Sequence, residues 1–502
     1  MSDAIGSTEE RGIPAGLGVL AATCVSTLVV NANTSAVTIL LPAIAEDVNA
    51  PVSTLQWAVT GYSLVGAAFI VTSGALGDVF GRRKIFIGGL VLFIASCVLI
   101  ALSDTQTGVI VGRCIQGAAG STILASGLSL LTVASSGSER LKAVSLWGAA
   151  SAVGAAAGPL VGGLLVDSTG WEGLFWIDAA IAAACIPITL RSIEESLDPT
   201  RPRSIDWFGT VLIATILAPL ILAVSKGADW GWTSPGVLVC LLVSAASVFL
   251  FVTVEQRSEA PLVDLALMRN RVLIGATLGI LIGAGTINGL MFVVSLYFQD
   301  PAALAMSPLD AGLATLPATI GLVVSAPLVP KMAQKAGAAT VVALGFGITA
   351  AGFGVLALTK SSWGYAAFVI PFLVAAVGMS MTNGPCSSVS TSAVPAEQVG
   401  AASGISNMAR YVGASVFTAV AAAVYSGTTT SKLDAGKEVD DALASGFARV
   451  ALVMAILSAL GIPLAIAAKR MRTPRPETID YAAAAASHSH TLPRLDPVPL
   501  VR

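Results

Sequence analysis

The chain has 502 residues, of which 55% are apolar and 11% are charged, and its formal net charge is −2. Soluble domains carry about 25% charged residues, so a water-soluble protein of this length is excluded. The mean hydropathy of +0.84 indicates a protein solvated by lipid, and nothing in its charge predicts a nucleic-acid partner.

Several function classes are excluded by residue type. No GxxxxGK[ST] stretch is present, so the chain has no ATP-hydrolysing P-loop of its own. The six cysteines show no CxxC spacing, and the only two histidines, His488 and His490, lie close to the C-terminal end. We therefore expect no disulfide framework, no metal or other cofactor, and no enzymatic activity.

Residues 1–15 are acidic and polar, without the positive n-region of a secretory signal. A helix needs about 20 apolar residues to cross about 30 Å of hydrocarbon, and only helices satisfy their backbone within one such segment. This criterion predicts an all-α membrane protein with fourteen spans. The spans are expected at 16–42, 54–76, 84–103, 107–133, 141–166, 171–190, 207–225, 235–255, 272–298, 309–329, 339–359, 363–388, 403–427 and 446–468.

Lysine and arginine indicate the orientation, because cytoplasmic loops carry an excess of both. With the N-terminus inside, the external loops hold only Lys226, Lys360, Lys432 and Lys437, and all other loop cations fall on the cytoplasmic side. We therefore expect a multi-pass protein of the plasma (inner) membrane with both termini cytoplasmic.

A faint internal repeat relates two loops. GALGDVFGRR (74–83) and PKMAQKAGAA (330–339) align on Gly81 and Gly337 and are eight spans apart. Two six-helix halves with an inserted pair are therefore expected, and repeated halves with a site between them are typical of transporters. The expected organisation is a cytoplasmic N-terminus (1–15), an N-terminal bundle (16–190), a linker with inserted spans seven and eight (191–271), a C-terminal bundle (272–468) and a disordered cytoplasmic tail (469–502).

The loop GALGDVFGRRK (74–84) is predicted to be a tight cytoplasmic turn. Its glycines permit a sharp reversal and close helix approach, and the Asp78 carboxylate can accept hydrogen bonds from a helix N-terminus or an arginine. Such a contact can form in one conformation and break in another. The alternative is that the basic residues only fix the orientation. The residues predicted to act as a conformational latch are Gly74, Asp78, Gly81, Arg82 and Arg83.

In span 107–133, the stretch GRCIQGAAG places Arg113 and Gln116 on one helix face with Gly117 and Gly120. An arginine inside the membrane is costly unless it faces protein or water, so Arg113 is a functional candidate. The alternative is a side chain that reaches back to the membrane interface.

In span 141–166, the stretch GAAAGPLVGG puts Gly154, Gly158 and Gly162 at four-residue spacing, beside Pro159 and Gly163. Small residues at this period let two helices touch backbone to backbone, and a proline bends its helix. The pattern predicts a packed, bendable seam.

These three stretches resemble signature motifs of the major facilitator superfamily, and the last resembles the antiporter motif of its drug exporters. Fourteen spans with an inserted central pair resemble the drug:proton antiporter branch of that family. Further similarity appears at Gln56, Trp57 and Tyr62, in PLVDLALMRNR (261–271) and in GISNMARYVG (404–413). The resemblance covers about residues 16–468 and implies the major facilitator fold, two six-helix bundles plus two inserted helices.

The first span departs from the family pattern. Family members commonly carry an aspartate nine residues before the proline of an LP pair, and the position so counted from Pro42 is Asn33. A neutral amide cannot titrate. Helical geometry places Asn31, but not Asn33, on a polar stripe, which favours cavity lining by Asn31. A hydrogen bond to a neighbouring helix is the alternative for either asparagine. The stripe comprises Thr27, Asn31, Thr34, Ser35 and Thr38.

The sixth span departs as well. Where the family resembles WRWxFxxNxP, this chain reads WEGLFWIDAA (171–180), with Asp178 at the place of the asparagine. Asp178, Arg113 and Asn33 lie at comparable depth. The hypothesis is that the titratable group has moved from the first span to Asp178, with Arg113 setting its affinity for a proton. The alternative is that Asp178 faces an outer aqueous vestibule and is inert.

In span 403–427, Asn407 and Arg410 lie three residues apart, and Arg410 is either functional or reaches the cytoplasmic interface. The complete predicted proton and substrate pathway comprises Asn31, Asn33, Arg113, Gln116, Asp178, Asn407 and Arg410.

The leading hypothesis is proton-coupled efflux, by antiport, of small amphipathic or hydrophobic compounds across the plasma membrane, through rocking of two halves about a central cavity. A monomer driven by the proton gradient is expected, in contact with substrate, protons and lipid. One alternative is a facilitator or self-resistance exporter of a neutral or anionic compound, without the usual acid in the first span. An alternative of another class is a transport-inactive membrane sensor or scaffold.

Overall fold

The computed structural model describes residues 15–134, 137–196, 206–258, 261, 263, 265, 267–394 and 399–470. Every regular element in these residues is a helix. The elements are α1 (Ala15–Asp47), α2 (Val52–Phe80), α3 (Arg82–Ala101), α4 (Gln106–Ala134), α5 (Gly137–Thr169), α6 (Glu172–Ser192), α7 (Trp207–Trp230), α8 (Pro235–Glu255), η1 (Leu267–Arg269), α9 (Arg271–Gln299), α10 (Pro308–Ala314), α11 (Leu316–Ser325), η2 (Ala326–Leu328), α12 (Val329–Ala336), α13 (Ala338–Leu356), α14 (Ala366–Ser392), α15 (Val399–Asp434) and α16 (Val439–Arg470).

The predicted fourteen spans are confirmed among the described residues. Thirteen helical segments are long and apolar enough to cross a membrane, and a bent pair within α5, Leu146–Ala155 and Ala157–Val166, makes the fourteenth. The two parts of α5 meet at 43°. Pro159 has no N–H to donate to the Ala155 carbonyl, so the sequence explains a bend at this point.

The tenth span is broken and longer than expected. It was predicted to end at 329, but α10, α11, η2 and α12 together cover Pro308–Ala336. Each of these four short helices has a proline at its first or second position, where the missing N–H interrupts no helical hydrogen bond. The tenth span is therefore a series of short helices rather than one continuous helix.

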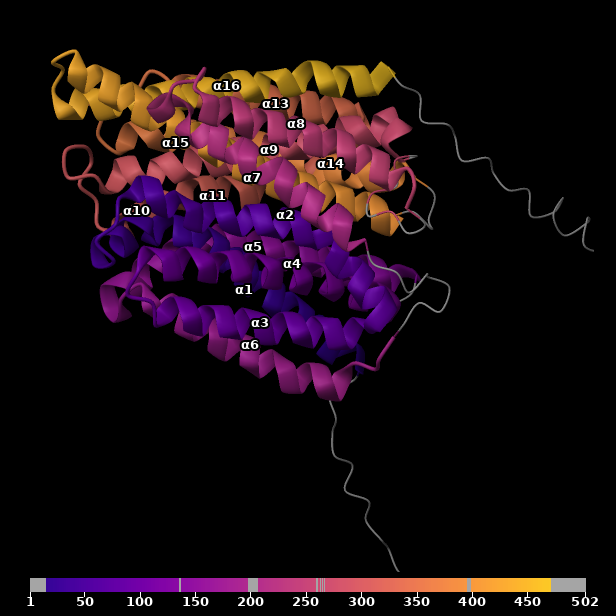
Figure 1. Cartoon of the computed structure of the whole chain (residues 1–502). Helices are drawn as coiled ribbons and strands as arrows, with labels where there is room; N and C mark the ends of the chain where they lie inside the picture. The colour runs from indigo at the N-terminus through magenta and orange to yellow at the C-terminus, as the bar shows by residue number, and fades with distance from the viewer. Residues whose placement is uncertain are drawn as a thin grey trace, which may run out of the picture.

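The helices lie side by side in one bundle, with the helices of the N-terminal half, drawn in indigo and purple, below those of the C-terminal half, drawn in orange and yellow (Figure 1). We call the end of the bundle where α1 begins and α16 ends the termini end, and the opposite end the far end. Of the predicted N-terminal segment (1–15) and tail (469–502), residues 1–14 and 471–502 lie outside the described residues, and α16 extends to Arg470.

Two glycines occupy equivalent places in the two halves. Gly81 ends α2 and precedes α3 with a φ of 110°, and Gly337 ends α12 and precedes α13 with a φ of 85°. Residues with a side chain rarely adopt such angles. The two loops that align in sequence therefore have the same kind of glycine turn between two spans.

The inserted helices lie beside the contact between the halves. α2 packs along α15, where the Ser415 hydroxyl donates to the Thr60 carbonyl at 3.5 Å. α7 packs against both α2 and α15, and the hydroxyls of Thr72 and Thr210 lie 2.5 Å apart. At the far end, the Gln299 amide of α9 donates to the Ile39 carbonyl of α1 at 2.9 Å. The halves therefore meet along α2 and α15 and again near the far end of α1.

Candidate functional site

Three helices of the N-terminal half bring together an amide, a cation and an anion. The Nδ2 of Asn33, on α1, donates to the Oδ2 of Asp178, on α6, at 2.7 Å. The Nη1 of Arg113, on α4, donates to the Oδ1 of Asn33 at 2.6 Å. The amide dipole thus presents its oxygen to the cation and its N–H group to the anion, so it stabilises both charges.

The same arginine is held from two further sides. Its Nε donates to the Ala58 carbonyl at 3.0 Å, and its Nη1 also donates to the Oε1 of Gln116. The Nε2 of Gln116 donates in turn to the Sγ of Cys97 at 3.1 Å. The two buried charges are joined through the Asn33 amide, while the Nη2 of Arg113 has no hydrogen-bond partner among the described residues. Buried charges are stabilised by pairing and hydrogen bonding, and most of these hydrogen bonds are made here.

These side chains are closed off from solvent. Asn33, Arg113 and Gln116 have exposed fractions of 0%, and Asp178 has 4%. We call these four residues the Asn33 cluster. Any change of charge inside it is made in a low-dielectric environment, so it acts strongly on the surrounding packing.

Tyr62 of α2 connects this cluster with the other half of the molecule. The guanidinium carbon of Arg113 lies 4.3 Å from the centroid of the Tyr62 ring, a cation–π geometry. The Tyr62 ring lies 6.4 Å from that of Tyr411 on α15. A Cβ at Gly117 would collide with the Tyr62 carbonyl, and one at Gly120 would lie 2.6 Å from the Tyr62 hydroxyl. The glycines of the RxxQG stretch therefore make room for Tyr62.

The structure brings four of the predicted pathway residues together but does not expose them. In this conformation the side chains of Asn33, Arg113, Gln116 and Asp178 are buried and hydrogen-bonded to one another, and their place on a proton and substrate pathway stays a prediction. The alternative for Asn33, a hydrogen bond to a neighbouring helix, is the one observed. Asp178 does not face an outer vestibule in this conformation, because its side chain is buried.

Asn31 lies on a different side of α1. Its side chain is partly exposed, and its Nδ2 donates to the Thr27 carbonyl one turn earlier at 2.8 Å. The predicted separation of Asn31 from Asn33 is therefore present in the structure, and Asn31 does not contribute to the Asn33 cluster.

The predicted latch has a partner that sequence reasoning missed. The Glu195 carboxylate, three residues after the end of α6, accepts hydrogen bonds from the backbone N–H of Arg83 at 3.0 Å and of Lys84 at 3.3 Å. It thereby caps the first turn of α3, whose dipole favours a negative charge. The Arg83 Nη1 donates to the Ile193 carbonyl at 3.0 Å, and the Arg82 N–H to the Ser196 carbonyl at 3.0 Å.

The side chain of Asp78, the predicted acceptor, lies outside the described residues. A Cβ at Gly74 would meet no described atom within 4 Å, so the close helix approach predicted at Gly74 is wrong. A Cβ at Gly81 would lie 2.6 Å from the Glu195 carboxylate, so close approach does apply there.

The glycines of α5 lie against α1. A Cβ at Gly154 would collide with the Leu28 carbonyl, one at Gly158 with the Ala32 carbonyl, and one at Gly162 would lie 3.1 Å from Ala36. Gly163 instead faces α10 of the other half, where its Cβ would lie 2.7 Å from the Leu309 Cα. The bent helix α5 is therefore packed backbone to backbone on one side and against the C-terminal half on another.

The remaining two pathway residues lie on α15. Arg410 is exposed, and its Nη2 reaches the Ser387 hydroxyl of α14 at 3.4 Å, whereas Asn407 is partly buried. Neither contributes to the Asn33 cluster. It is the next residue, Tyr411, that contacts Tyr62.

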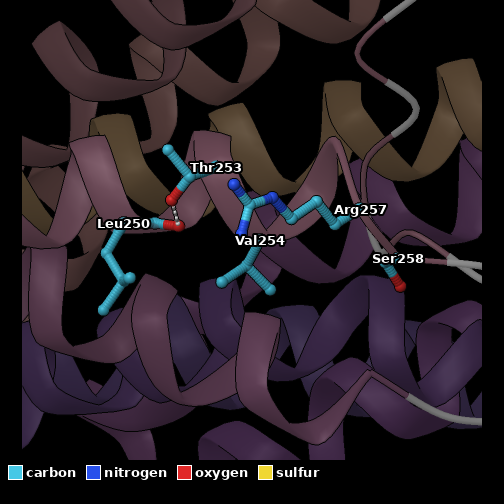
Figure 2. Close-up of a pocket in the computed structure, with 5 residues that line it drawn as sticks. All are labelled: Leu250, Thr253, Val254, Arg257 and Ser258. Carbon is cyan, nitrogen blue, oxygen red and sulfur yellow. Dashed lines mark hydrogen bonds between the residues drawn. The ribbon is translucent and has the colours of Figure 1, made fainter.

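A hollow of about 350 Å³ lies at the termini end of α8, lined by Leu250, Thr253, Val254, Arg257 and Ser258. Figure 2 shows that the Thr253 hydroxyl is used within the helix, where it donates to the Leu250 carbonyl at 2.8 Å. Arg257 and Ser258 lie at the helix end. This hollow shares no residue with the Asn33 cluster.

Fourteen apolar helices in two halves, with charged side chains buried inside one of them, are typical of a membrane transport protein. The chain belongs to the Major Facilitator Superfamily, whose family model matches residues 23–418. The predicted family, fold and non-enzymatic character are thereby confirmed.

Relatives with known roles include exporters. The tetracenomycin C resistance and export protein of Streptomyces glaucescens is 30% identical over 401 residues, which cover 80% of this chain and 74% of that protein. The multidrug efflux pump LfrA of Mycolicibacterium smegmatis is 30% identical over 416 residues, which cover 83% and 82%. A crystal structure of a bacterial homologue of the human lysosomal transporter Spinster, 14% identical, superposes with a TM-score of 0.65 over 93% of this chain and 98% of that one, which shows the shared fold.

Proposed function

We propose that this protein exports small amphipathic or hydrophobic compounds across the plasma membrane in exchange for protons, by alternating access. The names of the relatives support efflux of such compounds. The excess of basic residues at the termini end supports a cytoplasmic location for both termini. We further propose a monomer that uses the proton gradient without a cofactor.

The observation that carries the proton coupling is the contact between Asn33 and Asp178. In the family pattern described above, the first span has the acid and the sixth span has the amide. Here the first span has the amide and the sixth has the acid, and the two side chains touch. The pair therefore retains one carboxylate, which lies on α6 instead of α1. Arg113 donates a hydrogen bond to the amide member of the pair.

Burial explains how a proton at Asp178 acts on conformation. With Asp178 ionised, its charge offsets that of Arg113, whereas protonation leaves an uncompensated guanidinium in a closed interior. Such an imbalance is costly in a low-dielectric site, so protonation favours a conformation in which the cluster is hydrated. In this account, proton binding and opening of the N-terminal half toward water are two parts of one step.

The proposal is tested in inverted membrane vesicles from cells that express the chain. After a pH gradient is established, addition of a cationic dye that the protein exports is expected to discharge the gradient, and Asp178→Asn is expected to abolish this discharge. A gradient that Asp178→Asn vesicles discharge at the wild-type rate would overturn the role of Asp178.

A second candidate keeps the fold but not the coupling. The partly exposed stripe of α1 carries Asn31 and hydroxyl groups but no carboxylate, which favours a neutral or anionic compound over a cationic drug. A facilitator or self-resistance exporter of this kind is expected to protect cells against neutral or anionic compounds without discharging a pH gradient. A susceptibility panel in expressing cells, combined with Asn33→Asp, separates the two candidates. A transport-inactive sensor or scaffold would change susceptibility to none of them.

A further inference from the structure

A cavity of about 300 Å³ lies inside the C-terminal half, at the termini end and away from the Asn33 cluster. We call it the C-half pocket. At about 30 Å³ per water-sized group, it has room for about ten such groups. Its lining residues come from α9, the α12–α13 turn, α13, α14 and α16, and include Gly279, Thr340, Val342, Phe346, Cys386 and Gly461.

The lining is almost entirely apolar. Val342, Phe346 and Cys386 have exposed fractions of 6%, 1% and 3% and belong to one hydrophobic cluster. Two lipid-facing leucines flank the pocket on its outer helices, Leu344 on α13 at 51% exposed and Leu460 on α16 at 53%. A space of this size with apolar walls suits a hydrocarbon chain better than water.

The corresponding place in the N-terminal half is filled. Counted from the equivalent glycines Gly81 and Gly337, the fifth residue of the following helix is Phe86 in one half and Val342 in the other. The Phe86 ring is fully buried, and a Cβ at Gly127 of α4 would lie 3.3 Å from it. Val342 is smaller and lines an open cavity instead. The position that lines the pocket in the C-terminal half is therefore filled by a buried ring in the N-terminal half.

Of the four chain segments that line the pocket, three carry lysine or arginine and one carries no charge. The stretches 269–276, 329–342, 386–394 and 461–470 contain six lysines or arginines and no acidic residue. Arg271 directly precedes the lining residue Val272, and Lys335 directly precedes the lining residue Ala336. Both basic side chains are exposed. An apolar pocket with cations at its edge matches a molecule with a hydrocarbon chain and an anionic headgroup.

We propose that the C-half pocket holds one acyl chain of an anionic phospholipid, whose headgroup phosphate is bound by Arg271 and Lys335. The lipid enters from the leaflet that surrounds α13 and α16. The pocket shares no residue with the Asn33 cluster, so the proposal does not rest on proton coupling.

The first test uses the purified full-length protein and native mass spectrometry with phosphatidylglycerol or phosphatidylcholine. One phosphatidylglycerol is expected to remain bound, in clear preference to phosphatidylcholine. Val342→Phe, which copies the packing of Phe86, is expected to weaken this binding at least tenfold, and the matched change Leu344→Phe on the lipid-facing side is expected to leave it unchanged. Replacement of both Arg271 and Lys335 by glutamine is expected to remove the preference for phosphatidylglycerol.

Equal retention of phosphatidylglycerol by the wild type and Val342→Phe would overturn the proposal, as would equal binding of the two lipids by the wild type.

The second test uses the native thiol inside the pocket and needs no change to its walls. In a variant whose only cysteine is Cys386, N-ethylmaleimide is expected to modify that thiol in detergent. Phosphatidylglycerol is expected to slow the reaction at least tenfold, and phosphatidylcholine is expected to slow it little. Protection by an exported dye such as ethidium, with none by phosphatidylglycerol, would assign the pocket to the transported compound and overturn the lipid proposal.

Discussion

Exchange of the two side chains in the Asn33–Asp178 pair gives a quantitative prediction. Asp178→Asn alone removes the only carboxylate of the cluster and leaves the fully buried Arg113 without a counter-charge. Removal of one partner of a buried ion pair costs about 3–5 kcal/mol, and the amide bridge places this case near the lower figure. Asn33→Asp alone places two carboxylates within hydrogen-bond distance of each other beside one guanidinium, which is also unfavourable.

The double variant Asn33→Asp/Asp178→Asn restores one carboxylate, one amide and the same arginine. The carboxylate at position 33 then accepts from Arg113 directly, and the amide at position 178 donates to it. We expect the double variant to be within about 1 kcal/mol of the wild type, with a coupling energy of about 3 kcal/mol, which is large for residues in contact. Additive effects would instead make it less stable than either single variant.

The assay is reversible unfolding in mixed detergent micelles with increasing SDS, followed by tryptophan fluorescence, for all four proteins of the cycle. Asn31→Asp combined with Asp178→Asn is the matched control, because it places a carboxylate on the same helix but outside the cluster. The reasoning is refuted if the exchanged pair is no more stable than this control.

Three further predictions concern other contacts. Glu195→Ala removes the cap of α3 and is expected to lower the free energy of unfolding by about 1 kcal/mol in the same unfolding assay. Glu195→Gln is expected to have an intermediate effect. An unchanged unfolding midpoint in Glu195→Ala would contradict the capping role. Gly158→Val is expected to abolish the peak of folded protein in size-exclusion chromatography, because the new side chain meets the Ala32 carbonyl. Gly148→Val is the control and is expected to be tolerated, because there is open space around this position. Equal yields of the two variants would contradict the close packing of α1 and α5. Tyr62→Leu removes a cation–π contact worth about 2 kcal/mol when desolvated, and it is expected to lower the efflux of a fluorescent dye from cells. Tyr62→Phe retains the ring and is expected to retain most of the efflux. Equal loss of efflux in both variants would assign the effect to the hydroxyl.

Most of the fold follows from the sequence. Each expected span overlaps a helix or broken helix of the structure, because about 20 apolar residues in lipid have no alternative to helix formation. The alignment of Gly81 with Gly337 locates equivalent turns, since a positive φ restricts the residue type. The extension of the tenth span to Ala336 was missed because α12 is polar on one side and resembles a loop in composition.

The candidate site was predictable in its members but not in its arrangement. Depth along each span brings Asn33, Arg113 and Asp178 to a similar level, but depth does not determine which faces of three helices meet. That depends on packing between spans distant in sequence, such as the glycine contacts of α5 with α1. The sequence places Asn33 on the predicted pathway at the position of the missing acid, and the structure shows that its amide joins Asp178 to the arginine.

Glu195 could not be recognised from its surroundings. It lies in a polar stretch after the sixth span, where acidic and basic residues are common, and its partner is the backbone of a helix more than one hundred residues earlier. The only signal available was a carboxylate at the same end of the bundle as a helix N-terminus.

The central claim, that Asp178 carries the proton exchanged for substrate, is tested most directly with purified protein in liposomes that contain a pH-sensitive dye and have an acidic interior. Addition of ethidium outside is expected to make the lumen less acidic with the wild type, as protons leave in exchange for dye. With Asp178→Asn, ethidium is expected to bind but to move no protons. Proton movement by Asp178→Asn at the wild-type rate would contradict the account.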